Sequence, residues 1–136
     1  MPNANCLTLG IDHLGLSVRD LAQSVDFFVN CLGWQEFGGN SNYPSIYVTD
    51  GISKLTLWQT KSNTPKQFDR HQNVGLHHVA LKLATEADLN IVYDRLKNWP
   101  RVKVEFAPEL SGQGPKIHFM INEPSGNRIE FSFDPR

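Results

Sequence analysis

Apolar and polar residues alternate along several short stretches of the chain, and two longer stretches carry apolar residues three and four apart. The helical spacing predicts one helix over residues 21–32, capped by Asp20, and another over about 86–96, capped by Thr85. The alternating stretches predict eight strands, at residues 9–18, 34–37, 45–49, 54–60, 76–83, 102–106, 116–122 and 128–133. Each half of the chain is therefore expected to contain a strand, a helix and three further strands.

The opening stretch of the chain recurs in its second half. Residues 10–18 read GIDHLGLSV and residues 75–83 read GLHHVALKL, each with glycine first and a histidine fourth, His13 and His78. Self-similarity over about half of a chain predicts two copies of one supersecondary unit. We expect a single α+β domain over 8–136, with modules at about 8–62 and 74–134 joined by a polar connector, and the two imidazoles at equivalent places.

Composition and charge narrow the function classes. The chain has 136 residues, 40% hydrophobic and 20% charged, with a formal net charge of −1. This near-neutral net charge does not indicate a basic surface of the kind that binds nucleic acid or membranes. The two cysteines are too few for a disulfide framework, and the polar start at 1–5 does not have the pattern of a signal peptide. We expect a cytoplasmic protein.

Strand periodicity assigns three potential metal ligands to the polar faces of the strands. His13, His78 and Glu130 fall opposite the apolar residues that should pack under the helices, whereas His77 falls on the apolar side. Two neutral imidazoles and one carboxylate suit divalent iron, manganese, nickel or zinc and leave coordination positions open. The alternative is that each histidine is structural and that Glu130 forms a surface ion pair with Arg128.

Other side chains on the polar faces could contact a small-molecule substrate. His118 precedes Glu130 by one strand and could act as a general acid or base. The remaining candidates lie in the fourth and seventh predicted strands, and they are Lys54, Thr56, Trp58, Lys116 and Met120. These residues predict a lined cavity, although aromatic residues at such positions are more often part of a core.

The sequence resembles the vicinal oxygen chelate superfamily, which includes glyoxalase I, extradiol dioxygenases, and fosfomycin- and bleomycin-resistance proteins. DHLGLSV at 12–18 is similar to the family's opening strand, HVAL at 78–81 to the strand that starts its second module, and EPSGNRIEF at 123–131 to its last hairpin. The resemblance implies two βαβββ modules forming an open eight-stranded cup with a metal held by His13, His78 and Glu130. It also implies a homodimer, in some members with exchanged modules.

The resemblance has departures that bear on the reaction. Residues 54–59 read KLTLWQ, without the carboxylate that some glyoxalase-like members use as a fourth ligand. Met120 stands where extradiol enzymes usually have tyrosine. The resemblance implies a lyase- or isomerase-type step in which the metal chelates vicinal oxygens of a small substrate. The alternatives are oxidative chemistry at divalent iron, as in dioxygenases, and a binding protein of the bleomycin-resistance type without chemistry.

Overall fold

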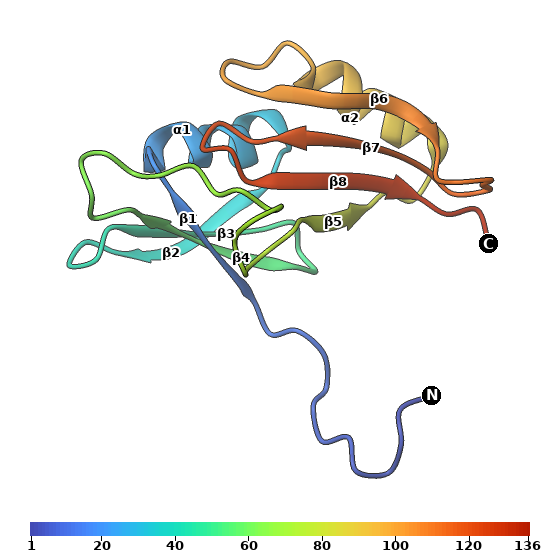
Figure 1. Ribbon diagram of the computed structural model, residues 1–136, viewed down its shortest axis with the longest axis horizontal. Coiled ribbons are helices and arrows are strands. Elements are labelled where there is room, and N and C mark those ends of the chain that lie inside the picture. The colour runs from blue at the N-terminus through green and yellow to red at the C-terminus, as the bar shows by residue number, and fades with distance from the viewer.

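The computed structural model describes all 136 residues and confirms the predicted α+β architecture of two βαβββ modules (Figure 1). The first module contains β1 (Leu14–Val18), α1 (Leu21–Asp26), the π-helix η1 (Phe27–Cys31), β2 (Gln35–Asn40), β3 (Ser45–Thr49) and β4 (Lys54–Gln59). The second contains β5 (Val79–Lys82), α2 (Glu86–Leu96), β6 (Lys103–Leu110), β7 (Ile117–Asn122) and β8 (Arg128–Phe133).

Each module forms its own four-stranded mixed sheet, and the two sheets are built alike. The strand orders are β1-β4-β3-β2 and β5-β8-β7-β6. In both, the first strand runs parallel to the last and the other pairs are antiparallel. No strand of one sheet pairs with a strand of the other, so the eight strands do not close into a barrel. The internal repeat of the sequence is thus a repeat of topology.

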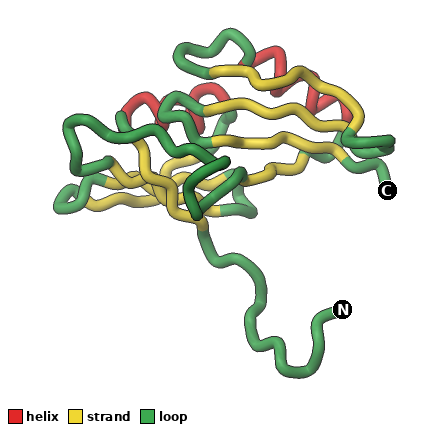
Figure 2. Tube along the Cα trace, viewed as in Figure 1, coloured by secondary structure: helices red, strands yellow, loops and turns green.

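The helices begin at the predicted caps and cover the apolar faces of the sheets (Figure 2). Asp20 Oδ1 accepts from the backbone N–H of Gln23, and Thr85 Oγ1 accepts from that of Asp88. The first predicted helix continues beyond α1 as the π-helix η1, which buries Phe27 and Phe28. These side chains belong to one hydrophobic cluster that includes Leu89 of α2, so both modules share a core.

Two predicted strands are shorter than the alternating pattern suggested. β1 begins at Leu14 and β5 at Val79. These are the first residues that pair with the neighbouring parallel strand, Leu14 with Leu55 of β4 and Val79 with Ile129 of β8. A strand needs a ladder partner, and apolar alternation before residue 14 has none. The placement of His77 on the apolar side was wrong for the same reason, since His77 lies before the strand and is exposed. Conversely, β6 is longer than the strand predicted at 102–106 and extends to Leu110.

The turn between β7 and β8 contacts the first module and holds the two halves together. The Ser125 hydroxyl accepts from the backbone N–H of Arg19 at 3.0 Å, and Asn127 Nδ2 donates to the Ser17 carbonyl at 3.1 Å. The Ser24 hydroxyl of α1 donates to Glu123 at 2.7 Å. This turn and the connector between the modules line a space beside the end of β1.

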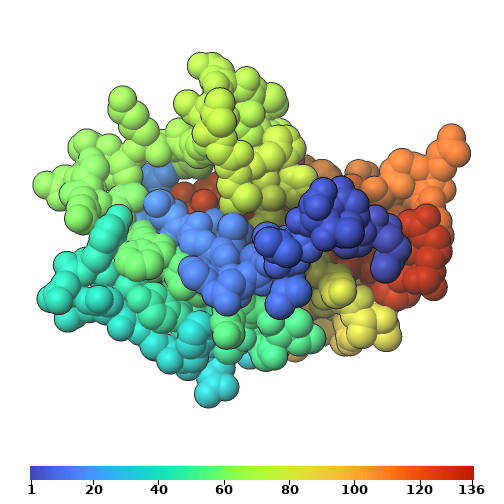
Figure 3. All heavy atoms as spheres, turned by 90° about the horizontal axis from the view of Figure 1, so that it is seen from below, coloured from blue at the N-terminus to red at the C-terminus, as the bar shows by residue number.

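The N-terminal segment before β1 extends away from the sheets (Figure 1). Its residues are all exposed, including the apolar Leu7, Leu9 and Ile11. Viewed from below, this segment therefore lies nearest to the viewer, in front of the rest of the molecule (Figure 3). None of the helices has the length and hydropathy needed to cross a membrane.

Candidate functional site

Glu130 lies between two imidazoles on the polar face of the second sheet. His118 Nδ1 is 2.6 Å from Glu130 Oε1, and His78 Nε2 is 3.3 Å from Glu130 Oε2. The Glu130 side chain is 13% exposed and that of His118 is 17% exposed, so this contact is shielded from solvent, whereas the His78 side chain is 33% exposed. β8 positions Glu130, β7 positions His118, and His78 directly precedes β5. The structure therefore brings together three of the residues singled out from the sequence.

His13 stands apart from this group. Its Nδ1 lies 2.6 Å from Asp12 Oδ2, and half of its side chain is exposed. The hydrogen bond to His13 lowers the pKa of Asp12 below its ordinary value. Within this single chain, no group of three or more His, Cys, Asp and Glu side chains is gathered closely enough to hold a metal ion. That His13, His78 and Glu130 together bind a metal ion therefore stays a prediction.

Even so, the two histidines occupy the equivalent positions that the repeat predicted. His13 directly precedes β1 and His78 directly precedes β5. Ala80 pairs with Glu130 in the second sheet, and the corresponding pair in the first sheet is Gly15 with Thr56. Thr56 therefore takes the place of Glu130, and its hydroxyl accepts a 2.8 Å hydrogen bond from Trp58 Nε1. The first module offers no carboxylate at that position.

The predicted substrate-contacting residues form two separate groups. On β4, Thr56 is buried and Trp58 packs against Tyr43 with ring centroids 5.0 Å apart, while Lys54 is exposed. On β7, Met120 is buried beside Glu130 in the strand register, and Lys116, which directly precedes β7, is half-buried. None of these five residues lines the two cavities of about 810 Å³ and 630 Å³. Their contact with substrate remains a prediction.

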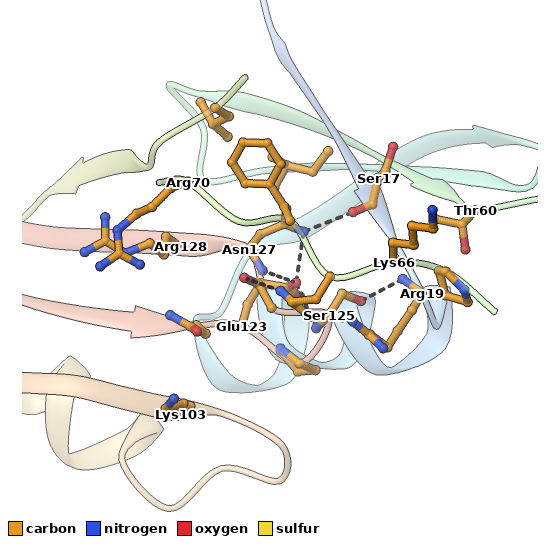
Figure 4. Close-up of a pocket in the computed structure, with 18 of the residues that line it drawn as sticks. Ser17, Arg19, Thr60, Lys66, Arg70, Lys103, Glu123, Ser125, Asn127 and Arg128 are labelled. Atoms are coloured by element: carbon orange, nitrogen blue, oxygen red, sulfur yellow. Dashed lines mark hydrogen bonds between the residues drawn. The ribbon is translucent and has the colours of Figure 1, made fainter. Parts of the chain in front are cut away.

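The larger cavity is a polar cleft between the modules, which the sequence patterns did not reveal (Figure 4). It has a volume of about 810 Å³, and only three of its 22 lining residues are hydrophobic. Its walls come from the end of β1, the connector, β6 and the β7–β8 turn. No local pattern could have indicated it, because its residues are spread from position 15 to position 128.

Arg128 is part of this cleft and does not pair with Glu130. Its Nε donates to Glu105 Oε2 at 2.8 Å, and Arg70 Nη1 lies 3.6 Å from the other oxygen of Glu105. The alternative in which Glu130 forms an ion pair with Arg128 was therefore wrong. The carboxylate of Glu130 instead contacts His78 and His118.

Two buried titratable groups have shifted pKa values. Burial raises the pKa of Glu123 above its ordinary value, although Ser24 and the backbone N–H groups of the β7–β8 turn hydrogen-bond to the carboxylate and oppose the shift. Burial likewise raises the pKa of the Cys31 thiol to about 11. Cys31 is 1% exposed and packs as a small core residue.

Comparisons with known proteins identify a family. The family model described as "Glyoxalase/Bleomycin resistance protein/Dioxygenase superfamily" matches residues 10–131. No curated protein sequence matches the chain significantly.

Solved structures show the same fold at low sequence identity. A glyoxylase/bleomycin resistance protein/dioxygenase domain from Frankia sp. EAN1pec is 20% identical, with a TM-score of 0.78 over 95% of this chain and 94% of that one. A lactoylglutathione lyase from Agrobacterium tumefaciens is 19% identical, with a TM-score of 0.69 and coverages of 94% and 96%. A genomically encoded fosfomycin resistance protein from Listeria monocytogenes is 15% identical, with a TM-score of 0.70 and coverages of 93% and 94%. At these identities the likeness extends to the fold alone.

Proposed function

Because the chain belongs to the glyoxalase/bleomycin resistance protein/dioxygenase superfamily, we propose that it is a metal-dependent enzyme acting on a small molecule. His13, His78 and Glu130 would hold a divalent iron, manganese, nickel or zinc ion. The observation that carries this proposal is the contact between His78 and Glu130 on the polar face of the second sheet.

The geometry of this contact fits two ligands of one ion. Nitrogen and oxygen ligands of one divalent ion, each about 2.1 Å from it, lie about 3 to 3.5 Å apart. His78 Nε2 and Glu130 Oε2 are 3.3 Å apart, close to that separation. His118 contacts the other carboxylate oxygen, which would orient Glu130 as an outer-shell partner orients a ligand.

His13 has the local environment of a metal-binding histidine. A carboxylate that accepts from Nδ1–H fixes the tautomer and leaves Nε2 with its lone pair free. Asp12 lies at this distance from His13 Nδ1. His13 therefore has Nε2 available, and the donor chemistry of the set, two imidazoles and one carboxylate, fits a divalent ion.

The metal would supply Lewis acidity toward two neighbouring substrate oxygens. We propose a lyase- or isomerase-type step in which His118 accepts or returns the proton, since it is shielded and hydrogen-bonded to Glu130. Lys54, Thr56 and Trp58 on one sheet and Lys116 and Met120 on the other would contact the substrate. Oxidative chemistry at divalent iron is the alternative that the same ligand set allows.

The proposal includes a homodimer in which the partner subunit's His13 completes the site. Three features support it: the two sheets of one chain do not join, His13 stands apart from His78 and Glu130, and the segment that carries it is exposed. A cytoplasmic location is also proposed, because Cys6 and Cys31 are both free thiols.

Metal content provides the first test. Protein purified without an affinity tag or chelator should contain near-stoichiometric divalent metal by elemental mass spectrometry, and Glu130→Gln or His78→Ala should lose it. His71→Ala is the matched control, because His71 is exposed in the connector. Wild-type protein that neither contains nor takes up divalent metal would refute the proposal and favour a binding protein of the bleomycin-resistance type.

Complementation tests whether the site is shared between subunits. His13→Ala and His78→Ala chains carrying different tags are co-expressed, and the heterodimer is isolated through both tags. A site shared between subunits leaves one of the two sites in this heterodimer intact, so half of the wild-type metal content should return. A site contained within one chain leaves neither intact, and the heterodimer would then bind no more metal than either parent.

A further inference from the structure

From the cleft between the modules we infer a second binding site, for a small organic polyanion whose phosphate or carboxylate oxygens meet Lys103, Asn122 and Arg128. This site does not depend on the proposed metal. Figure 4 shows Lys103, Arg70 and Arg128 toward one end of the cleft, Lys66 and Thr60 toward the other, and the turn with Glu123 and Ser125 between them.

The strand register brings the three residues together. Asn122 is the direct partner of Lys103 in the β6–β7 ladder and of Arg128 in the β7–β8 ladder. Directly opposed residues on neighbouring antiparallel strands project from the same face, with their Cβ atoms about 5 Å apart. A cation therefore flanks the Asn122 amide on each side, and all three residues line the cleft.

Asn122 has a hydrogen-bond donor that nothing in the chain satisfies. Its Nδ2 is buried without a partner, one of only three side-chain nitrogen or oxygen atoms in that state. A second, Thr60 Oγ1, belongs to a residue lining the same cleft. Buried donors are almost always paired, so an orphan needs an explanation. Because the Asn122 amide nitrogen is not held, it can rotate toward the cleft and donate to a ligand oxygen without breaking a bond.

The charged residues that line the cleft favour the binding of an anion. Six of the chain's 13 Lys and Arg residues line this one cleft, against two of its 14 acidic residues. Glu105 is shared by Arg128 and Arg70, and the buried Glu123 is occupied by its own hydrogen bonds. Lys103 is exposed and has no ion-pair partner. A chain of net charge −1 thus concentrates positive charge where a cavity can focus it.

The chemistry favours oxyanions with several charges. Guanidinium and amide N–H groups match carboxylate and phosphate oxygens, and a lysine adds a point charge. With few hydrophobic residues in its walls, the cleft offers little to an apolar ligand. A ligand with two or more anionic groups could reach several of the cations at once.

Isothermal titration calorimetry on protein freed of metal with a chelating resin tests the inference. Pyrophosphate and citrate are the two probes, one for phosphate and one for carboxylate chemistry. We expect a Kd below about 1 mM for at least one of them at moderate salt. The probe with the lower Kd shows whether the site prefers phosphate or carboxylate groups, and equal Kd values indicate a general oxyanion site.

Two variants and a matched control locate the binding. Asn122→Asp replaces the free donor with a negative charge and should weaken binding about tenfold, and Lys103→Met about fivefold. Lys82→Met makes the same charge change on exposed β5, outside the cleft, and should leave the Kd within about twofold. A Kd above about 1 mM for both probes, or equal losses in Lys82→Met and Lys103→Met, would overturn the site. Because no metal is present, neither result bears on the proposed metal centre.

Discussion

The hydroxyl of Ser24 donates a 2.7 Å hydrogen bond to Oε2 of Glu123, a residue 99 positions away in the other module. The Glu123 side chain is fully buried, and its other oxygen accepts from the backbone N–H groups of Ser125 and Asn127 and from Asn127 Nδ2. One carboxylate thereby organises the β7–β8 turn and ties it to α1. The same turn forms a wall of the intermodule cleft.

Removing this carboxylate should destabilise the protein more than removing the hydroxyl. Ser24→Ala deletes the buried hydrogen bonds of this hydroxyl to Glu123 and Ser125, and we expect a loss of about 1.5 kcal/mol in the free energy of unfolding. Glu123→Ala leaves several buried donors unsatisfied, and we expect a loss of about 3 kcal/mol. Urea denaturation measures both. Ser41→Ala, at an exposed position, is the control; an equal loss there would contradict the explanation.

The raised pKa of Glu123 predicts a pH dependence of stability. A carboxyl group whose pKa is higher in the folded than in the unfolded state binds more protons when folded, so its contribution to stability falls as pH rises. The fall begins near the ordinary value of 4.5 and ends at the raised pKa of the folded state. Glu123→Gln is neutral throughout and should lack this dependence.

Unfolding measured across this pH range in both proteins tests the sign. The stability of wild type relative to Glu123→Gln should decline as pH rises above 4.5 and then level off. A relative stability that increases with pH would mean that hydrogen bonding to the carboxylate outweighs its burial.

The two cysteines should differ sharply in reactivity. Cys6 is exposed, whereas Cys31 is buried and its thiol pKa is raised by burial to about 11. Because the thiolate is the reactive form, native protein treated with iodoacetamide near neutral pH should gain one label, and Cys6→Ser should gain none. Mass spectrometry counts the labels. Rapid labelling of Cys31 in the folded protein would show that η1 opens readily.

The neighbouring His77 and His78 should respond differently to substitution. His77 is exposed and precedes β5, so His77→Ala should change the free energy of unfolding by no more than about 0.5 kcal/mol. His78 contacts Glu130, so His78→Ala should abolish the proposed metal binding, whereas His77→Ala removes only the 2.7 Å hydrogen bond between the two Nδ1 atoms and should weaken it less. Denaturation and metal analysis of both variants separate the two roles. Loss of metal in His77→Ala alone would reverse the assignment.

The sequence by itself determined the elements, the repeat and the face on which most candidate residues lie. Strand alternation and helix caps are local signals, so β3 and β8 have the predicted bounds and Asp20 and Thr85 cap the two helices as predicted. The pattern also placed Glu130 and His118 on the same face, and they are in contact. The prediction was wrong at His77, because the apolar–polar alternation in the sequence starts before Val79, where pairing of β5 with β8 begins.

Only the tertiary structure decided how the modules meet. Periodicity carries no information about rigid-body placement, so it could not show that the two sheets remain separate or that His13 stands apart from His78. The partner of Arg128 is Glu105 on another strand, which no local pattern indicates. The basic cleft likewise depends on long-range packing, because the chain's near-neutral net charge conceals six cations that folding gathers along one cavity.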